Sequence, residues 1–166
     1  MRMDLKKFKL EDLLLAAIKS EIDARDVYER LAMKVKTAFL LQRLDFLADE
    51  EAKHRKFLET VFKSKFPKKA LTVPKESPVP LPSVTVVEKD PLVSQVLEKA
   101  MAAEKATKEF YESLMGRFKD DKDIREGLAS LAKMEGNHYK LLEVEVEKLR
   151  HEEDYVIDWP LMHAGP

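Results

Sequence analysis

Four long segments of the sequence carry apolar residues at alternating spacings of three and four, the pattern of a helix that buries one face. The segments are about 11–36, 38–65, 90–118 and 123–152. The whole chain has 166 residues but only four glycines, and 37% of its residues are charged. This composition favours long, salt-rich helices over a sheet. The sequence therefore predicts an all-α, four-helix bundle with one core.

Two helix starts have recognisable capping residues. Asp90 and Pro91 suit the N-cap and the first turn of the third helix, where a proline loses no hydrogen bond. Asp123 and Glu126 have the spacing of a capping box at the start of the fourth helix. We therefore expect both helices of the second half to begin at an aspartate.

Residues 66–90 hold five of the eight prolines of the chain. They predict a long, semi-rigid crossover connection between the second and third helices, with a short strand at 83–87. We expect the bundle to cover residues 1–152 and residues 153–166 to form a C-terminal tail. We expect no helix to extend far past Pro160 in that tail.

Each of the four apolar faces is interrupted by polar residues at its middle. Counted from the turns near Thr37 and Asp120, the interrupting glutamates of each helical hairpin lie at nearly equal distances along the chain, and hence at one level. In the second and fourth helices a histidine follows the glutamate by three residues, so both side chains share one face. The interrupting residues are Glu21, Glu51, His54, Glu104, Glu135 and His138.

The two halves of the chain also resemble each other. Residues 17–31 and 100–114 share five of 15 positions, and residues 44–59 and 128–143 share eight of 16. Both Glu-x-x-His pairs are among the shared positions. This similarity predicts a duplicated helical hairpin, with the two copies related by a pseudo-twofold axis.

Four carboxylates and two imidazoles cannot lie unneutralised in a dry core, because an isolated buried ion costs several kcal/mol or more. Two divalent cations would balance four carboxylates while the imidazoles bind in the neutral form. Carboxylate and imidazole ligands suit iron or manganese. A single Glu-x-x-His pair is usually part of a solvated helix face, but its repetition at one level of the core predicts a dinuclear metal site.

Three further residues lie close to these positions in the sequence. Tyr28 and Tyr111 follow the first glutamate of each half by seven residues, on the same helix face. They are either core tyrosines or groups that donate to the ligands or act as redox-active neighbours. Glu50 either orients a histidine across the bundle or lies on the surface.

At these residues the sequence resembles the ferritin-like superfamily, and most closely the rubrerythrin-like di-iron proteins. The resemblance spans about residues 10–152 and rests on "SEIDARDVYERL", "ADEEAKHRKFLE", "AAEKATKEFYESL" and "KMEGNHYKLLE". It implies a ferritin-like four-helix bundle whose long connection lies between helices 2 and 3. It also implies two bound iron ions whose ligands are Glu21, Glu51, His54, Glu104, Glu135 and His138.

The sequence departs from the family pattern in three ways. It has no cysteine, so it lacks the rubredoxin domain of rubrerythrins proper and any other thiolate centre within the chain. Thr107 stands where rubrerythrins carry an extra glutamate. This departure argues against efficient peroxide reduction. Ala52 stands where bacterioferritins carry a haem-ligating methionine, so no haem is expected.

The resemblance implies a non-haem di-iron oxidoreductase that reduces hydrogen peroxide or O₂ with electrons from an external, rubredoxin-like donor. The alternatives are a ferroxidase or iron-binding protein for iron storage or delivery, and a structural bundle with a vestigial site. A net charge of −1 gives no reason to expect nucleic acid as a partner. No apolar run approaches the length of a membrane span, so we expect a cytoplasmic protein. A homodimer with exchanged helices is also open.

Overall fold

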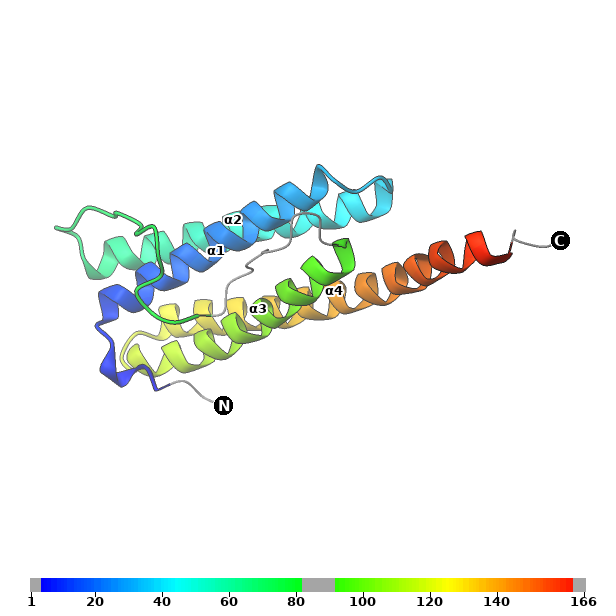
Figure 1. The fold of residues 1–166 in the computed structure, drawn as a ribbon. Coiled ribbons are helices and arrows are strands. Elements are labelled where there is room, and N and C mark those ends of the chain that lie inside the picture. Colours follow the sequence, from blue (N-terminus) through cyan, green and yellow to red (C-terminus); the bar gives the residue numbers. More distant parts are fainter. Residues whose placement is uncertain (1–3, 82–91, 163–166) are drawn as a thin grey trace.

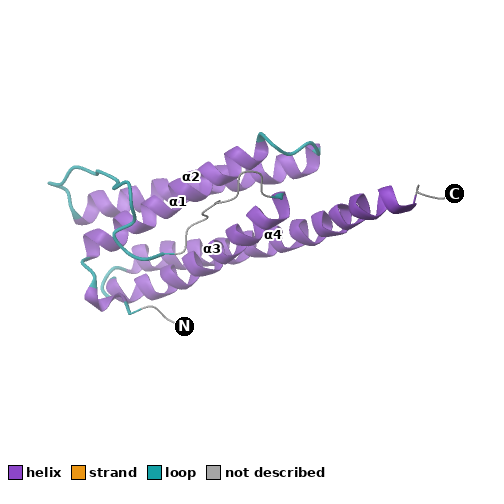
Figure 2. Cartoon of the chain, in the orientation of Figure 1, coloured by secondary structure: helices purple, strands orange, loops and turns teal. Residues whose placement is uncertain are grey.

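The computed structural model describes residues 4–81 and 92–162, with side chains as far as residue 152. The described chain forms four long helices and contains no strand (Figures 1 and 2). Two short 3₁₀ helices, η1 and η2, precede α1 and follow α3. The elements are η1 (Leu5–Lys7), α1 (Leu10–Ala32), α2 (Ala38–Lys65), α3 (Val93–Leu114), η2 (Met115–Arg117) and α4 (Lys122–Met162). The predicted all-α bundle is confirmed.

The helices form two antiparallel hairpins that lie against each other (Figure 1). Most interhelical contacts join α1 to α2 and α3 to α4, and fewer join α1 to α3 and α2 to α4. Because α2 and α3 run in the same direction, the chain between them must return along the bundle. Residues 66–81 of this connection contain no helix or strand. The rest, including the predicted strand at 83–87, lies outside the described residues, so the crossover as a whole stays a prediction.

The core consists of two apolar clusters, one toward each end of the bundle. One contains Leu14, Leu58 and Leu114, and the connection contributes the fully buried Val79 to it. The other contains Leu44 and Leu97. The buried carboxylates and imidazoles lie between these clusters. Burial of the apolar faces above and below therefore holds the polar level in place without requiring the polar residues to stabilise the fold.

The helix ends agree with the sequence prediction in α2 and differ elsewhere. The bounds of α2 match the predicted segment 38–65. The first helix ends at Ala32, four residues before the predicted end at Lys36, because the chain needs residues 33–37 to reverse into α2.

The predicted N-cap at Asp90 is wrong. Leu92 is the N-cap of α3, and its backbone N–H donates to the side-chain oxygen of Gln95 at 3.1 Å. A glutamine at the third helical position thus satisfies the free N–H. Asp90 itself lies outside the described residues. Helix α3 ends at Leu114, and η2 carries the chain on to the predicted end near Phe118.

The predicted capping box at Asp123 is also displaced. The carboxylate of Asp121 accepts a hydrogen bond from the backbone N–H of Ile124 at 3.2 Å, which is the N-cap interaction. Asp121 also accepts from Lys65 Nζ of α2 at 2.8 Å. This contact with the other hairpin favours Asp121 over Asp123 as the cap.

Helix α4 continues to Met162, ten residues past the predicted end at Glu152. No glycine or proline lies between Glu152 and Pro160, so nothing in the local sequence ends the helix earlier. Pro160 lies in the last turn, where its missing N–H costs one hydrogen bond. The end of α4 extends beyond the other three helices (Figure 1). Among the described helices, none combines the length and apolar content needed to cross a membrane.

Candidate metal centre

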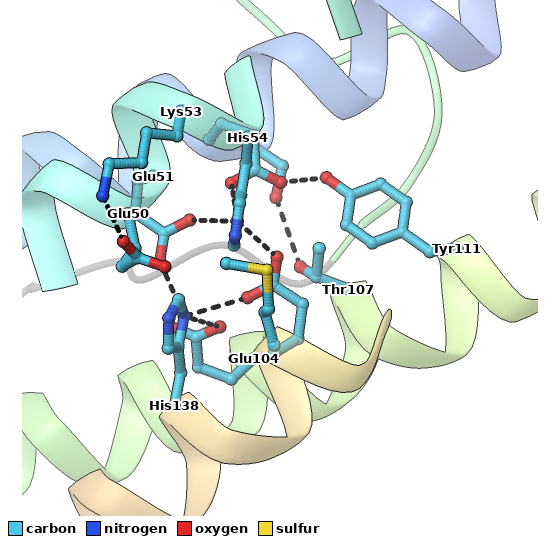
Figure 3. A network of polar contacts seen from close by, with 12 residues as sticks. Glu50, Glu51, Lys53, His54, Glu104, Thr107, Tyr111 and His138 are labelled. Carbon is cyan, nitrogen blue, oxygen red and sulfur yellow. Dashed lines mark hydrogen bonds and ion pairs between the residues drawn. The ribbon is translucent and has the colours of Figure 1, made fainter. Parts of the chain in front are cut away.

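All six interrupting residues come together at the middle of the bundle. Each helix turns its polar position inward because the apolar residues above and below it on the same face are buried. None of the six side chains belongs to a residue more than 4% exposed. Helices α1 and α3 contribute one glutamate each, and α2 and α4 contribute a glutamate and a histidine each (Figure 3). The six are Glu21, Glu51, His54, Glu104, Glu135 and His138.

The cluster divides into two overlapping groups of four potential ligand atoms. In each group, one oxygen or nitrogen from every residue lies within 4.8 Å of the others. Glu51 and Glu135 belong to both groups. One group adds Glu21 and His54, and the other adds Glu104 and His138. This arrangement is compatible with two neighbouring metal ions, for which Glu51 and Glu135 would be common ligands.

The two imidazoles face the carboxylates with the same ring nitrogen. His54 Nδ1 lies 3.0 Å from Glu135 Oε1 and 3.2 Å from Glu51 Oε2. His138 Nδ1 lies 3.0 Å from Glu51 Oε1 and 3.2 Å from Glu135 Oε2. The rings stack with their centroids 5.4 Å apart (Figure 3). The pseudo-twofold relation seen in the sequence therefore holds for the atoms of the site.

The cluster fits a pair of metal ions better than a hydrogen-bonded network. Six of its buried side-chain atoms have no hydrogen-bond partner among the described residues, although several lie within 3.5 Å of one another. Unsatisfied buried polar atoms are rare in folded proteins and usually have an explanation such as a bound ion. The six atoms are Glu51 Oε1, both ring nitrogens of His54, both oxygens of Glu135 and His138 Nδ1.

Without metal, the cluster neutralises itself with protons. Burial raises the pKa of Glu21 and Glu104 well above the usual range, and repulsion from Glu135 adds to this. Burial favours neutral histidine, but contacts with the carboxylates outweigh it and raise the pKa of His138 to about 12 and that of His54 also. Metal binding would displace these protons, so metal ions and protons compete for the site.

Two tyrosines hold the outer glutamates from the opposite hairpin. The hydroxyl of Tyr28 on α1 donates to Glu104 Oε1 on α3, and the hydroxyl of Tyr111 on α3 donates to Glu21 Oε1 on α1. Both tyrosines are at most 1% exposed. Burial and the nearby Glu104 raise the pKa of Tyr28 well above its usual value, so its hydroxyl keeps its proton. Of the two readings open from the sequence, the structure supports donors to the cluster.

Comparison with known proteins places the chain in a family. The model of the rubrerythrin family matches residues 12–156. The chain belongs to the rubrerythrin family. Among solved structures, it is similar to a hypothetical protein from Pyrococcus furiosus, with 35% identity and a TM-score of 0.78 over 89% of this chain and 94% of that chain. No curated protein matches the sequence.

In this rubrerythrin-family chain, a small cavity of about 40 Å³ lies between α1 and α3 and reaches the carboxylates. Its walls include the hydroxyl residues Ser20 and Thr107, whose oxygens lie 3.3 Å apart, and small alanines such as Ala24 and Ala103. Leu81 of the connection also lines it. Thr107, one of the positions at which the sequence departs from the family pattern, therefore lines the cavity. Figure 3 shows its side chain beside the cluster.

Glu50 lies at the edge of the cluster. Its side chain is 13% exposed, and it accepts a hydrogen bond from Lys53 at 2.6 Å (Figure 3). One of its oxygens also lies within 4.8 Å of nitrogens of His54 and His138. Glu50 is therefore half-buried and lies outside the two groups of four, although it forms a third group of potential ligand atoms with the two histidines. Its role in orienting a histidine stays a prediction.

Two features of the site were not expected from the sequence. The sequence did not indicate which ligand each tyrosine would contact, and each contacts the glutamate of the other hairpin. The contact between Ser20 and Thr107 joins residues 87 positions apart and has no periodic signal. The tyrosine pairing could have been found by applying the pseudo-twofold axis to both halves of the sequence.

Proposed function

We propose that this protein is a non-haem di-iron oxidoreductase that reduces hydrogen peroxide or O₂ with electrons from an external donor. The observation that carries the proposal is the pair of four-residue groups sharing Glu51 and Glu135, with buried atoms that lack hydrogen-bond partners. The proposed ligands are the six buried residues of the cluster. Their oxygen and imidazole donors suit iron, with manganese as the chemically similar alternative.

Reduction of hydrogen peroxide to two waters consumes two electrons and two protons. Two iron ions held between the hairpins would supply both electrons, one from each ion. The protein's own residues hold the site in shape. Tyr28 and Tyr111 fix one oxygen of Glu104 and Glu21 and leave the other oxygen free to bind metal. The apolar clusters above and below exclude bulk water.

The cavity between α1 and α3 favours a small oxidant as the substrate. A water molecule occupies about 30 Å³ in the liquid, so 40 Å³ accommodates a molecule of the size of peroxide or O₂. Pockets for larger organic ligands measure about 300–1,000 Å³. The hydroxyls of Ser20 and Thr107 offer hydrogen bonds to a polar oxidant along this wall.

Stopped-flow mixing of the iron-loaded, reduced protein with peroxide and, separately, with O₂ tests the proposal. We expect rapid oxidation by one of them and repeated turnover when reductant is supplied. The variant Glu51→Ala/Glu135→Ala should bind no stoichiometric iron and show neither reaction. A reduced protein that holds two irons per chain yet does not react with peroxide or O₂ would overturn the proposal.

A second pair of variants tests the cavity as the route of the oxidant. Ala103→Leu adds bulk to the cavity wall and should slow oxidation by peroxide severalfold while two irons still bind. Ala102→Leu adds the same bulk at the exposed neighbouring position of α3 and should leave the rate unchanged. Equal rates in both variants would show that the oxidant reaches the iron by another path.

Ferroxidase-coupled iron storage or delivery is the competing role for the same cluster. Storage requires a hollow assembly, so light scattering of the iron-loaded protein separates the two roles. A large particle with a mineral core would favour storage, and a monomer or dimer without one would favour the oxidoreductase. The homodimer, the rubredoxin-like donor and the cytoplasmic location stay predictions.

A further inference from the structure

The outer side of the α3–α4 hairpin carries a basic groove that the proposed chemistry does not use. It is an open groove of about 720 Å³, and its lining includes four lysines, two from each helix. We call it the lysine groove. Its lysines are Lys105, Lys108, Lys133 and Lys140. Gly136 and Asn137, which lie between Lys133 and Lys140 in the sequence, also line it.

The positive charge of the groove is largely unpaired. Lys105, Lys133 and Lys140 make no ion pair with another described residue. Lys108 lies 3.8 Å from Glu112, and both of these side chains are more than a third exposed. Some lysines elsewhere have close partners, such as Lys65 with Asp121 at 2.8 Å, but others, such as Lys56 and Lys63, make no ion pair with another described residue. What distinguishes the groove is that four lysines of two helices line one surface. With a net charge of −1 for the whole chain, the groove is a local concentration of charge and not a property of the entire surface.

The matching face of the other hairpin is not basic. By the repeat, Lys105, Lys108 and Lys133 correspond to Ile22, Arg25 and Asp49, and only Lys140 has a lysine counterpart, Lys56. On that face Arg25 donates to Glu29 at 2.7 Å. Like charges that line one groove disfavour the isolated protein slightly, because they repel each other. The duplication does not explain them, so a partner that binds them is the physical explanation we pursue.

The groove and the candidate metal centre lie on opposite sides of α3 and α4. Lys105 directly follows Glu104 on α3, and Gly136 and Asn137 lie between Glu135 and His138 on α4. The inner sides of these two helices carry the cluster, and the outer sides carry the groove. A helix with its side chains is about 10–12 Å across. A partner seated in the groove would thus approach the cluster to about one helix diameter.

We propose that the lysine groove docks an acidic one-electron carrier protein that supplies electrons to the metal centre. This inference rests on the proposed function, because a di-iron oxidoreductase without a cysteine needs an external donor. Two reduced carriers would each lose one electron and together return two ferric ions to the ferrous state. Complementary charge gives such an encounter its rate and its orientation.

The test compares reduction by a protein with reduction by a small molecule. The oxidised, iron-loaded protein is mixed with reduced rubredoxin, a small acidic one-iron carrier, at low ionic strength. The groove variant is Lys105→Glu/Lys133→Glu/Lys140→Glu, which changes exposed and unpaired residues. The matched control is Lys34→Glu/Lys56→Glu/Lys63→Glu, which makes the same charge change at exposed lysines outside the α3–α4 hairpin.

We expect the groove variant to lower the second-order rate constant of reduction at least about tenfold, and to abolish most of its dependence on salt. The control variant should remain within about twofold of the original protein at equal ionic strength. Reduction by the neutral molecule hydroquinone and oxidation by peroxide should be unchanged in all three proteins. If the groove variant binds less iron, the glutamine triple variant at the same positions replaces it, with a smaller effect in the same direction.

Calorimetric titration of oxidised rubredoxin into the protein measures docking without turnover. Loss of binding in the groove variant alone supports the docking surface, even if the reduced protein proves inert to peroxide and the proposed function fails. Equal reduction rates and equal binding in the groove and control variants overturn the inference. Tighter groove-dependent binding of inorganic phosphate or of a single-stranded oligonucleotide than of rubredoxin also overturns it, because the groove would then serve a different anion.

Discussion

The two hairpins of this rubrerythrin-family protein agree on their inner sides and differ on their outer sides. Inside, α1–α2 and α3–α4 each contribute two glutamates, one histidine and one tyrosine at equivalent positions. Outside, α3–α4 carries the lysine groove, whereas on the α1–α2 hairpin Arg25 pairs with Glu29 and Arg55 with Glu59. The inner residues must satisfy one cluster together, so the repeat is retained there. The outer residues have no such shared constraint.

The hairpins also differ where their helices are joined. The N-cap of α2, Thr37, makes no hydrogen bond with its side chain. The start of α4 is held by Asp121, which accepts from Ile124 N–H and from Lys65 of the other hairpin. The α3–α4 hairpin is therefore tied to its neighbour at the end where α2 finishes. The comparison predicts that substitutions at equivalent inner positions of the two hairpins change stability equally. Substitutions at the starts of α2 and α4 should change it unequally.

The largest expected effect is loss of metal-dependent stability. Saturating metal at about 1,000 times the dissociation constant stabilises a protein by about 4 kcal/mol, because it binds only the folded state. Glu51→Ala and Glu135→Ala should each remove most of this gain, and to a similar extent, since both residues belong to both groups. Thermal unfolding with and without ferrous iron, together with metal analysis, measures it.

Glu143→Ala, an exposed glutamate of α4, serves as the control for those two variants and should keep the full gain. Full metal-dependent stabilisation in either Glu51→Ala or Glu135→Ala would contradict the proposal that both glutamates are metal ligands. A large gain in one and none in the other would show that the inner sides are not equivalent.

The next effect concerns the tyrosines. Tyr28→Phe and Tyr111→Phe each leave a buried carboxyl oxygen without its donor, which costs about 1–3 kcal/mol. We expect similar losses in the two metal-free variants by chemical denaturation. Tyr139→Phe, on a half-buried tyrosine outside the cluster, is the control. Losses that differ by more than the spread of repeated measurements would show that the two hairpins hold their glutamates unequally.

Much of this fold was predictable because its determinants are periodic. The alternating spacing of apolar residues locates four helices, and the interruptions at Glu51 and Glu135 stand out only against that regular pattern. The duplication then supports placing all six polar residues at one level. Their role as ligands is still a prediction, but their convergence in the core follows from residues such as Leu47 and Leu131 packing on either side.

What was missed depends on contacts between distant segments. The cap of α4 is Asp121 and not Asp123, and the partner that distinguishes the two is Lys65, 56 residues earlier. Tyr28 of one hairpin contacts Glu104 of the other because the two hairpins pack against each other. The spacing of residues within one helix does not reveal such a contact. The lysine groove likewise combines residues of two helices, and its unpaired charge becomes visible only once the neighbours are known.

A smaller effect is expected where the inner sides differ. Ser20 and Thr107 form a hydroxyl pair, whereas their equivalents in the repeat are Ala103 and Ala24. Thr107→Val and Ser20→Ala should each cost about 0.5–1.5 kcal/mol, and the double variant should cost less than the sum because it removes both partners. Urea denaturation of the four proteins gives this cycle. Strict additivity would mean that the two hydroxyls do not interact.

The smallest effect concerns the helix starts and their dependence on pH. The hydrogen bond from Lys65 and that from Ile124 N–H lower the pKa of Asp121 below its usual value of 3.8. A carboxylate with a lowered folded pKa stabilises the protein above its unfolded pKa, and this contribution is lost as the pH falls through the folded value. Asp121→Asn keeps a capping side chain but removes the charge. Its unfolding midpoint should therefore lie slightly below that of the original protein near neutral pH. The difference should decrease as the pH falls below 3.8 and vanish below the lowered pKa of the folded protein.

Thr37→Ala, at a cap without a side-chain hydrogen bond, should change the midpoint less than Asp121→Ala at neutral pH. If Thr37→Ala proves as costly as Asp121→Ala, the two hairpin ends are held alike, and the asymmetry between them is confined to the outer faces.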